Sequence, residues 1–157
     1  MKINISGLSE GVHTYDLLKS AAEFGLEQNF LGEISAHITL EKSIHQILAT
    51  VNASVKGVFI CDRCTDEFDE EVKTLFTSVY SWNEDDAMED NDDFHILRKE
   101  NNIIDLSQSV KEYLMLSVPV KLLCKKNCTI PETIEAEQNA TDPRWEKLQT
   151  LLQSEKN

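Results

Sequence analysis

The four cysteines of this chain form two close pairs, Cys61-Asp62-Arg63-Cys64 and Cys124-Lys125-Lys126-Asn127-Cys128, separated by 59 residues. This pattern constrains the fold more than any other, because chemistry that joins the pairs must bring two distant segments together. A C-x2-C turn lets two thiolates reach one ion, and Zn²⁺ accepts four thiolates in a tetrahedron. The spacing therefore predicts one zinc ion per chain, with the ligands Cys61, Cys64, Cys124 and Cys128.

Two alternatives to a zinc site remain open for these pairs. A usual zinc ribbon has roughly 15–20 residues between its pairs, so here the longer spacer must fold as structure of its own. Reduced cysteines can also pack together as small apolar residues without any metal. A redox dithiol is the second alternative, and the acidic residues around the first pair disfavour a reactive thiolate there. Lys125 and Lys126 make the second pair the better thiolate.

Length and composition predict one domain, residues 1–157, with 41% hydrophobic residues to build a core. The chain has no apolar run of about 18 residues that would span a membrane. The apolar stretch among its first residues is too short, and the segment too polar, to be a signal peptide. We therefore expect a cytoplasmic protein, in which stable disulfides are rare.

The formal net charge of −13 argues against a nucleic-acid surface spread over the whole protein. It permits a basic protein partner, and it also simply favours solubility. The predicted partner-binding residues are a small group of cations close to the cysteines: Arg63, Lys121, Lys125 and Lys126.

Alternation of apolar and polar residues predicts most of the chain as strands. The expected strands are residues 2–8, 12–18, 32–40, 44–55, 72–82 and 94–97. Lys56-Gly57 is expected to form a bulge, and the acidic residues 66–71 a turn. Residues 19–26 are expected to contain one helical turn that ends at Gly25.

Two helices are expected. The first covers residues 105–116, with Asp105 as its cap, Gln108 completing a capping box, and Pro119 beyond its end. The second begins at Asp142-Pro143. Its apolar stripe consists of Trp145, Leu148, Leu151 and Leu152. Most of residues 83–93 are acids, which predicts a mobile, solvated loop, and residues 129–141 are expected to be a loose linker.

These elements predict an α+β domain with a mostly antiparallel curved sheet or partial barrel of about six strands and two helices packed on it. No phosphate-binding, hydrolase or metalloprotease motif is present. The four histidines share no spacing with a nucleophile. The sequence therefore predicts a protein that is not an enzyme.

Several short motifs, in order, resemble the bacterial YceD-like family of large ribosomal RNA subunit accumulation proteins, which has plastid relatives. The resemblance covers most of the chain. Its residues are Leu8, Gly11, His13 and Tyr15; Gly57, Cys61, Arg63 and Cys64; Ile104-Asp105-Leu106; Glu112, Leu114, Leu116 and Pro119; Cys124 and Cys128; and Asp142-Pro143-Arg144.

The resemblance implies a non-enzymatic role in the synthesis, processing or accumulation of 23S ribosomal RNA and in assembly of the large ribosomal subunit. The implied partners are ribosomal RNA or a basic large-subunit ribosomal protein. Many members carry a further cysteine pair after the second one, whereas no cysteine follows Cys128 here. The alternative function is a thiol-based redox or metal-sensing protein that uses the two cysteine pairs.

Overall fold

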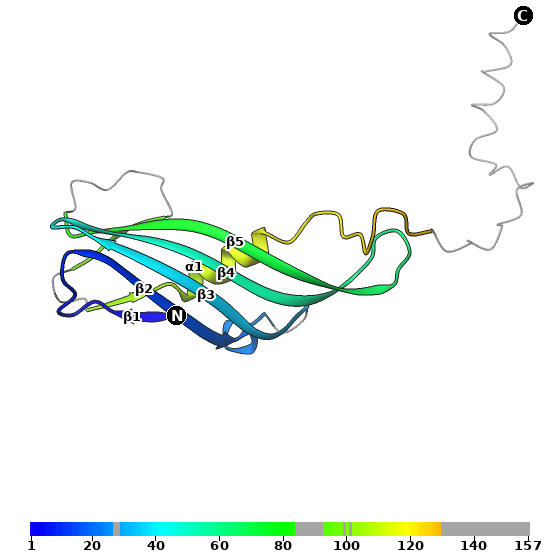
Figure 1. Ribbon diagram of the computed structural model, residues 1–157, viewed down its shortest axis with the longest axis horizontal. Helices are drawn as coiled ribbons and strands as arrows, with labels where there is room; N and C mark the ends of the chain where they lie inside the picture. Colours follow the sequence, from blue (N-terminus) through cyan, green and yellow to red (C-terminus); the bar gives the residue numbers. More distant parts are fainter. Residues whose placement is uncertain (27–28, 84–92, 99, 101, 130–157) are drawn as a thin grey trace, which may run out of the picture.

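The computed structural model describes residues 1–26, 29–83, 93–98, 100 and 102–129, which form an α+β structure (Figure 1). Its strands are β1 (Lys2–Asn4), β2 (Gly11–Ser20), β3 (Phe30–Lys42), β4 (Gln46–Ile60), β5 (Glu67–Ser81), β6 (Phe94–Ile96) and β7 (Ile103–Asp105). The helical elements are a 3₁₀ turn, η1 (Ala21–Phe24), and one α-helix, α1 (Ser107–Leu116). The 3₁₀ turn ends at Gly25, as predicted, and Gly25 has a left-handed conformation.

The strands form a five-stranded sheet in the order β2-β3-β4-β5-β6 and a two-stranded sheet of β1 and β7. All pairs are antiparallel except β5 with β6. The expectation of a mostly antiparallel sheet is thus confirmed. Among the described residues the main sheet is open, with β2 and β6 at its two edges, and does not close into a barrel.

The predicted alternation places the core on one face of the main sheet. In β3 the inward residues Ile34, Ala36, Ile38 and Leu40 are buried, and in β4 the same holds for Ile47, Ala49, Val51 and Ala53. The inward residues of β5 from Val72 to Tyr80 are also buried. Helix α1 packs against β4 and β5 and covers this face. The stacking of Tyr113 on Phe76, with ring centroids 4.3 Å apart, joins the helix to the sheet.

Two local predictions are wrong. Residues 67–71 belong to β5 and pair with residues 56–60 of β4, so they do not form a turn. Acidic residues have low β propensity, but the ladder with β4 and the packing of Phe68 near Phe59 outweigh it. Lys56-Gly57 is regular strand, and the irregularity lies in β3 instead, between Leu31 and Ser35.

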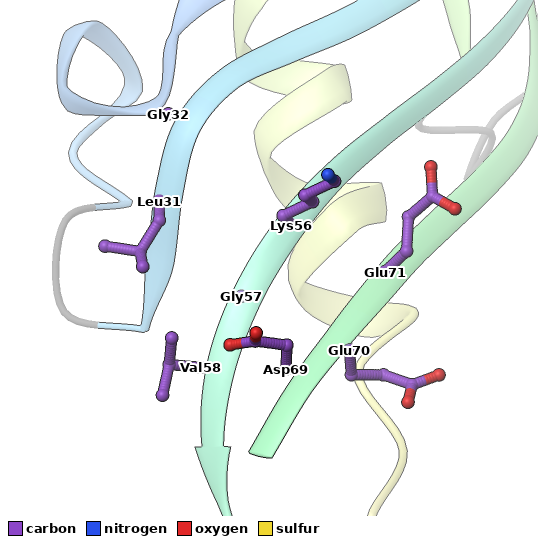
Figure 2. Close-up of a pocket in the computed structure, with 8 residues that line it drawn as sticks. All are labelled: Leu31, Gly32, Lys56, Gly57, Val58, Asp69, Glu70 and Glu71. Carbon is purple, nitrogen blue, oxygen red and sulfur yellow. The ribbon is translucent and has the colours of Figure 1, made fainter. Parts of the chain in front are cut away.

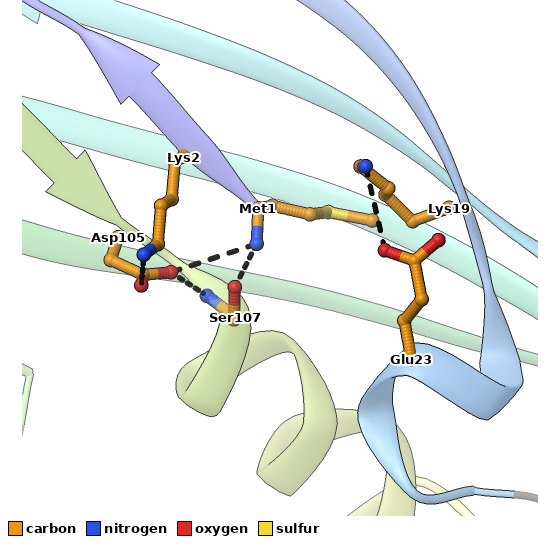
Figure 3. A network of polar contacts seen from close by, with 6 residues as sticks. All are labelled: Met1, Lys2, Lys19, Glu23, Asp105 and Ser107. Carbon is orange, nitrogen blue, oxygen red and sulfur yellow. Dashed lines mark hydrogen bonds and ion pairs between the residues drawn. The ribbon is translucent and has the colours of Figure 1, made fainter.

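The N-terminal end of α1 is held by a polar network (Figure 3). The helix begins at Ser107, two residues later than predicted, and the Asp105 carboxylate accepts a hydrogen bond from the Ser107 amide at 3.0 Å. The Met1 amine donates to the Ser107 hydroxyl and lies 3.6 Å from Asp105. The predicted capping box does not form, because the Gln108 amide donates to Glu112.

The network lowers the pKa of Asp105. Burial alone would raise it, but the hydrogen bonds from Ser107 and the positive charges of the Met1 amine and Lys2 outweigh burial. The ionised carboxylate is therefore the form that stabilises the start of α1.

Three predicted features lie outside the described residues: most of the acidic loop, residues 84–92; the linker from residue 130; and the helix from Asp142. No helix in the described part of the chain is long and apolar enough to cross a membrane.

Candidate metal centre

The two cysteine pairs lie together at one end of the main sheet. Cys61 follows the last residue of β4, and the first pair occupies the tight connection between β4 and β5. The second pair follows α1 through residues 117–123, which run beside that connection (Figure 1). The prediction that the long spacer would fold and return its ends to one place is confirmed.

All four sulfur atoms lie within 4.8 Å of one another. The Sγ atoms of Cys64 and Cys124 are 3.5 Å apart, and those of Cys61 and Cys128 are 3.7 Å apart. Each cysteine of the first pair thus faces one cysteine of the second, and all four are free thiols.

These distances fit a tetrahedral metal. Four sulfurs at about 2.3 Å from a central Zn²⁺ are roughly 3.8 Å from each other. A disulfide would need sulfurs about 2.05 Å apart. The two pairs therefore supply four soft donors, two of whose separations match those around a zinc ion, without a further cysteine pair after Cys128.

Hydrogen bonds between the two loops hold this arrangement. The amide of Asp62 donates to the carbonyl of Leu122 at 2.8 Å, and the amide of Leu122 donates back to the Asp62 carboxylate at 2.7 Å. The Arg63 guanidinium donates to the carbonyl of Lys126 at 2.8 Å. Asp62 and Arg63, the two residues inside the first pair, therefore position the second pair.

The turn around the first pair is closed by backbone hydrogen bonds. The amide of Thr65 donates to the carbonyl of Cys61 at 3.0 Å, and the amide of Cys61 donates to the carbonyl of Asp66 at 2.9 Å. Thr65 has φ of 62° and is the one non-glycine residue with positive φ in the described chain. A β-branched residue is strained in that conformation.

Sequence reasoning missed the roles of Asp62 and Thr65. In the sequence Asp62 is one of several negative charges near the first pair, and nothing there distinguishes Thr65. The available signal was the tight C-x2-C turn itself, because such a turn needs a left-handed residue near its end.

The amides around the cluster favour ionised sulfur. The amide of Cys124 donates to Cys61 Sγ at 3.4 Å and, with the amides of Cys64 and Arg63, lowers the pKa of Cys61 to about 6. A backbone hydrogen bond from Asp66 also favours the Cys64 thiolate. Burial and hydrogen bonding with Cys61 and Cys124 outweigh that bond and raise the pKa of Cys64 to about 12. Burial likewise raises the pKa of Cys124.

One cysteine with a lowered pKa beside others with raised pKa values is the pattern expected when four close sulfur atoms compete to carry negative charge. A divalent cation in their centre would remove the repulsion and let all four ionise. The donors are soft, their number is four and their sulfur atoms lie within 4.8 Å of one another, a combination that can accommodate Zn²⁺.

The cations predicted to contact a partner have different surroundings. Arg63 is half-buried and occupied by its bond to Lys126. The side chains of Lys121, Lys125 and Lys126 are exposed. A hollow of about 300 Å³ lies beside the cluster, lined in part by Lys125 and Asn127.

Three of the four histidines have ordinary roles that do not involve the cysteines. His13 bonds with the carbonyl of Ser9, His37 pairs with Asp16, and the ring of His95 packs on Tyr80.

The fold and site together define a class: an α+β protein with an open five-stranded main sheet and a four-cysteine cluster at the end of its β4–β5 hairpin. Residues 49–152, well over half of the chain, match the model of the family described as "Large ribosomal RNA subunit accumulation protein YceD". The chain belongs to this family. The predicted resemblance is confirmed, and the family name connects the chain with accumulation of large-subunit ribosomal RNA.

Similar proteins occur in mycobacteria. The chain is 23% identical over 150 residues to an uncharacterized protein of Mycobacterium bovis and to one of Mycobacterium tuberculosis. In both cases the match covers 88% of this chain and 72% of the relative. No solved structure is significantly similar to this chain.

Proposed function

We propose that this protein is a non-enzymatic factor that promotes accumulation of 23S ribosomal RNA and assembly of the large ribosomal subunit, acting in the cytoplasm. The observation that carries the proposal is the family match over residues 49–152. The family's description refers to the accumulation of an RNA, which suits a role in binding rather than in chemistry.

Within that function we assign Cys61, Cys64, Cys124 and Cys128 to one structural zinc ion. When bound, zinc supplies four bonds that tie the β4–β5 connection to the segment after α1. Asp62 and Arg63 fix the second loop against the first through their bonds to Leu122 and Lys126. The metal closes a loop of about sixty residues, which restricts the unfolded chain and stabilises the fold.

The proposed partner surface is the end of the molecule that carries the cluster. Lys121, Lys125 and Lys126 are exposed there and offer three positive charges on a chain of net charge −13. Such a small patch suits contact with a few phosphates of ribosomal RNA, whereas the acidic remainder suits a basic ribosomal protein.

The experiment that tests the function is deletion of the gene with measurement of both ribosomal RNAs. We expect 23S RNA or its precursor to fall relative to the small-subunit RNA, with the larger effect in the cold. A plasmid copy should restore the ratio. Unchanged ratios at every growth temperature would contradict the function.

A matched set of variants tests the partner surface. A triple Lys121→Gln, Lys125→Gln, Lys126→Gln variant should fail to restore 23S RNA while it retains its fold. A control variant replaces three exposed lysines elsewhere on the protein: Lys2→Gln, Lys19→Gln and Lys56→Gln. This control should restore the level of 23S RNA. Capture of the tagged protein, with identification of bound RNA and proteins, then names the partner.

The thiol-based alternative requires an accessible thiolate of lowered pKa. Cys61 has the lowered pKa, but its side chain is 0% exposed and Cys64 is 7% exposed. Titration with a thiol reagent separates the two functions. Thiols that react only after unfolding or chelation support the structural site, whereas fast reaction of the native protein supports the redox function.

A further inference from the structure

One edge of the main sheet is left without a strand over most of its length. β5 pairs with β4 along its whole length, residues 67–81, but with β6 only at Val79–Ser81. Residues 67–78 therefore have no strand on their other side within the described part of the chain. An unpaired edge offers a template for a further strand.

The hydrogen bonds at β6 show which groups face this edge. Val79 donates its amide to the carbonyl of Asp93 at 2.8 Å, and Ser81 accepts from the amide of Leu97 at 2.7 Å. Both bonds lie on the β6 side, and groups in an antiparallel strand alternate from side to side. The residues of β5 that face the free edge are therefore Asp69, Glu71, Lys73, Leu75 and Thr77. On that side their backbone groups have no partner strand among the described residues.

The first half of this edge, residues 67–71, is strongly negatively charged. Glu67, Asp69 and Glu71 are exposed. Figure 2 shows the side chain of Glu70 pointing away from β4. Asp69, Glu70 and Glu71 line a hollow of about 350 Å³ together with one cation, Lys56, and with apolar walls from Leu31 and Val58. Its three acids outnumber that lysine. A long cationic side chain fits this combination, because its stem contacts apolar atoms while its charge meets a carboxylate.

The second half of the edge has a different character. Lys73 pairs with Glu71 at 2.8 Å, and Leu75 is 70% exposed. A strand that lies along β5 would therefore place cations opposite the acids and an apolar side chain opposite Leu75. Backbone bonds would supply affinity, and the alternating side chains would supply selectivity.

We propose that the free edge of β5 binds an extended, lysine- or arginine-rich protein segment as an additional β-strand. This goes beyond the proposed function, because it requires neither the metal nor contact with RNA. A second copy of this chain fits less well. An antiparallel β5–β5 pair centred on Val72 sets Lys73 opposite Glu71, but it joins two chains of net charge −13. It also leaves Glu67 and Asp69 opposite the uncharged Thr77 and Leu75.

The test uses the full chain and a synthetic peptide of about ten residues in which lysine alternates with valine or threonine. Binding is followed by calorimetry, and the site is mapped by amide hydrogen exchange. We expect the amides of Glu71, Lys73 and Leu75 to become at least about tenfold more protected, with no gain at their neighbours that already bond to β4.

Three controls separate strand addition from simple charge attraction. The same peptide with N-methyl groups on the amides that face β5 should lose binding, since its charge is unchanged but its ladder donors are blocked. The variant Glu67→Gln, Asp69→Asn, Glu71→Gln should bind at least about tenfold more weakly. A control with the same charge change on other exposed residues, Glu10→Gln, Glu33→Gln, Glu41→Gln, should bind within about twofold of wild type.

A further variant removes the edge donor itself. Leu75→Pro lacks an amide that faces the free edge and keeps the ladder with β4, so it should fold and bind the peptide weakly. Equal binding of the N-methylated peptide, or equal weakening by the two acidic triples, would overturn the proposal. Protection of the edge amides in the protein alone would also overturn it, because a second copy or residues 130–157 would then occupy the edge.

Discussion

Gly57 gives the sharpest test of the packing that leads into the cysteine cluster, and we predict that Gly57→Ala destabilises the protein. An added Cβ would lie 2.7 Å from a ring carbon of Phe59 and 2.8 Å from the carbonyl oxygen of Asn29. That carbonyl accepts the amide of Val58 at 2.8 Å, so it cannot move away freely. Phe59 is held between Phe30 and Phe68, with centroid distances of 5.9 and 6.3 Å.

The sign of this effect is not obvious without the structure. Replacing glycine by alanine in a strand normally stabilises by roughly 0.5–1 kcal/mol. Overpacking costs about 1–3 kcal/mol, and weakening the bond to Asn29 costs about 1 kcal/mol more. The net expectation is a loss of about 2 kcal/mol, which lowers Tm by roughly 4–8 °C for a chain of this length.

The assay is thermal and urea unfolding of wild type, Gly57→Ala and a control, Lys56→Ala. Lys56 is the exposed neighbour of Gly57, and its substitution should change stability by less than about 0.5 kcal/mol. Because Phe59 lies two residues before Cys61, Gly57→Ala should also weaken retention of the metal. A Gly57→Ala protein that melts at or above the wild-type temperature would refute this account of the close approach.

Three further predictions concern the cluster and the start of α1. Cys128→Ser should lose the metal and about 3 kcal/mol of stability, measured by metal content and unfolding, whereas loss of under 1 kcal/mol would indicate a packing role only. Thr65→Gly should stabilise by about 1 kcal/mol because it relieves the residue with φ of 62°, and a lower Tm would contradict that strain. Asp105→Ala should cost about 1 kcal/mol at neutral pH. Because the pKa of Asp105 is lowered from 3.8, its stabilisation is present above that pH and is lost as pH falls below it, so the variant and wild type should converge in acid.

The sequence predicts the core of the main sheet well, since apolar residues occupy every second position along much of β3 and β4. Ile34, Ile38 and Val51 are buried as their alternation requires. The prediction from sequence failed where tertiary contacts decide the secondary structure. Residues 67–71 are all polar except Phe68, and only their register against β4 shows that they form a strand. The short β1–β7 pair was not predicted as a sheet, because a strand of three residues is too short to show an alternation of apolar and polar residues.

The meeting of the four cysteines at one place was predictable from the sequence. Spacing alone joined Cys61 and Cys64 with Cys124 and Cys128, because close cysteine pairs have few causes. It did not reveal how the loops hold each other, since the bond between Asp62 and Leu122 links residues sixty apart in sequence. The free edge of β5 also could not be predicted from the sequence, because the order of strands in a sheet depends on the whole fold and not on any local pattern.

The most direct test of the central claim is the metal content of protein purified without a histidine tag, measured by elemental analysis together with native mass. The account predicts one zinc per chain, lost on acidification or chelation together with a fall in Tm. Fully folded, metal-free protein with four titratable thiols, unchanged in Tm when zinc is added, would contradict it.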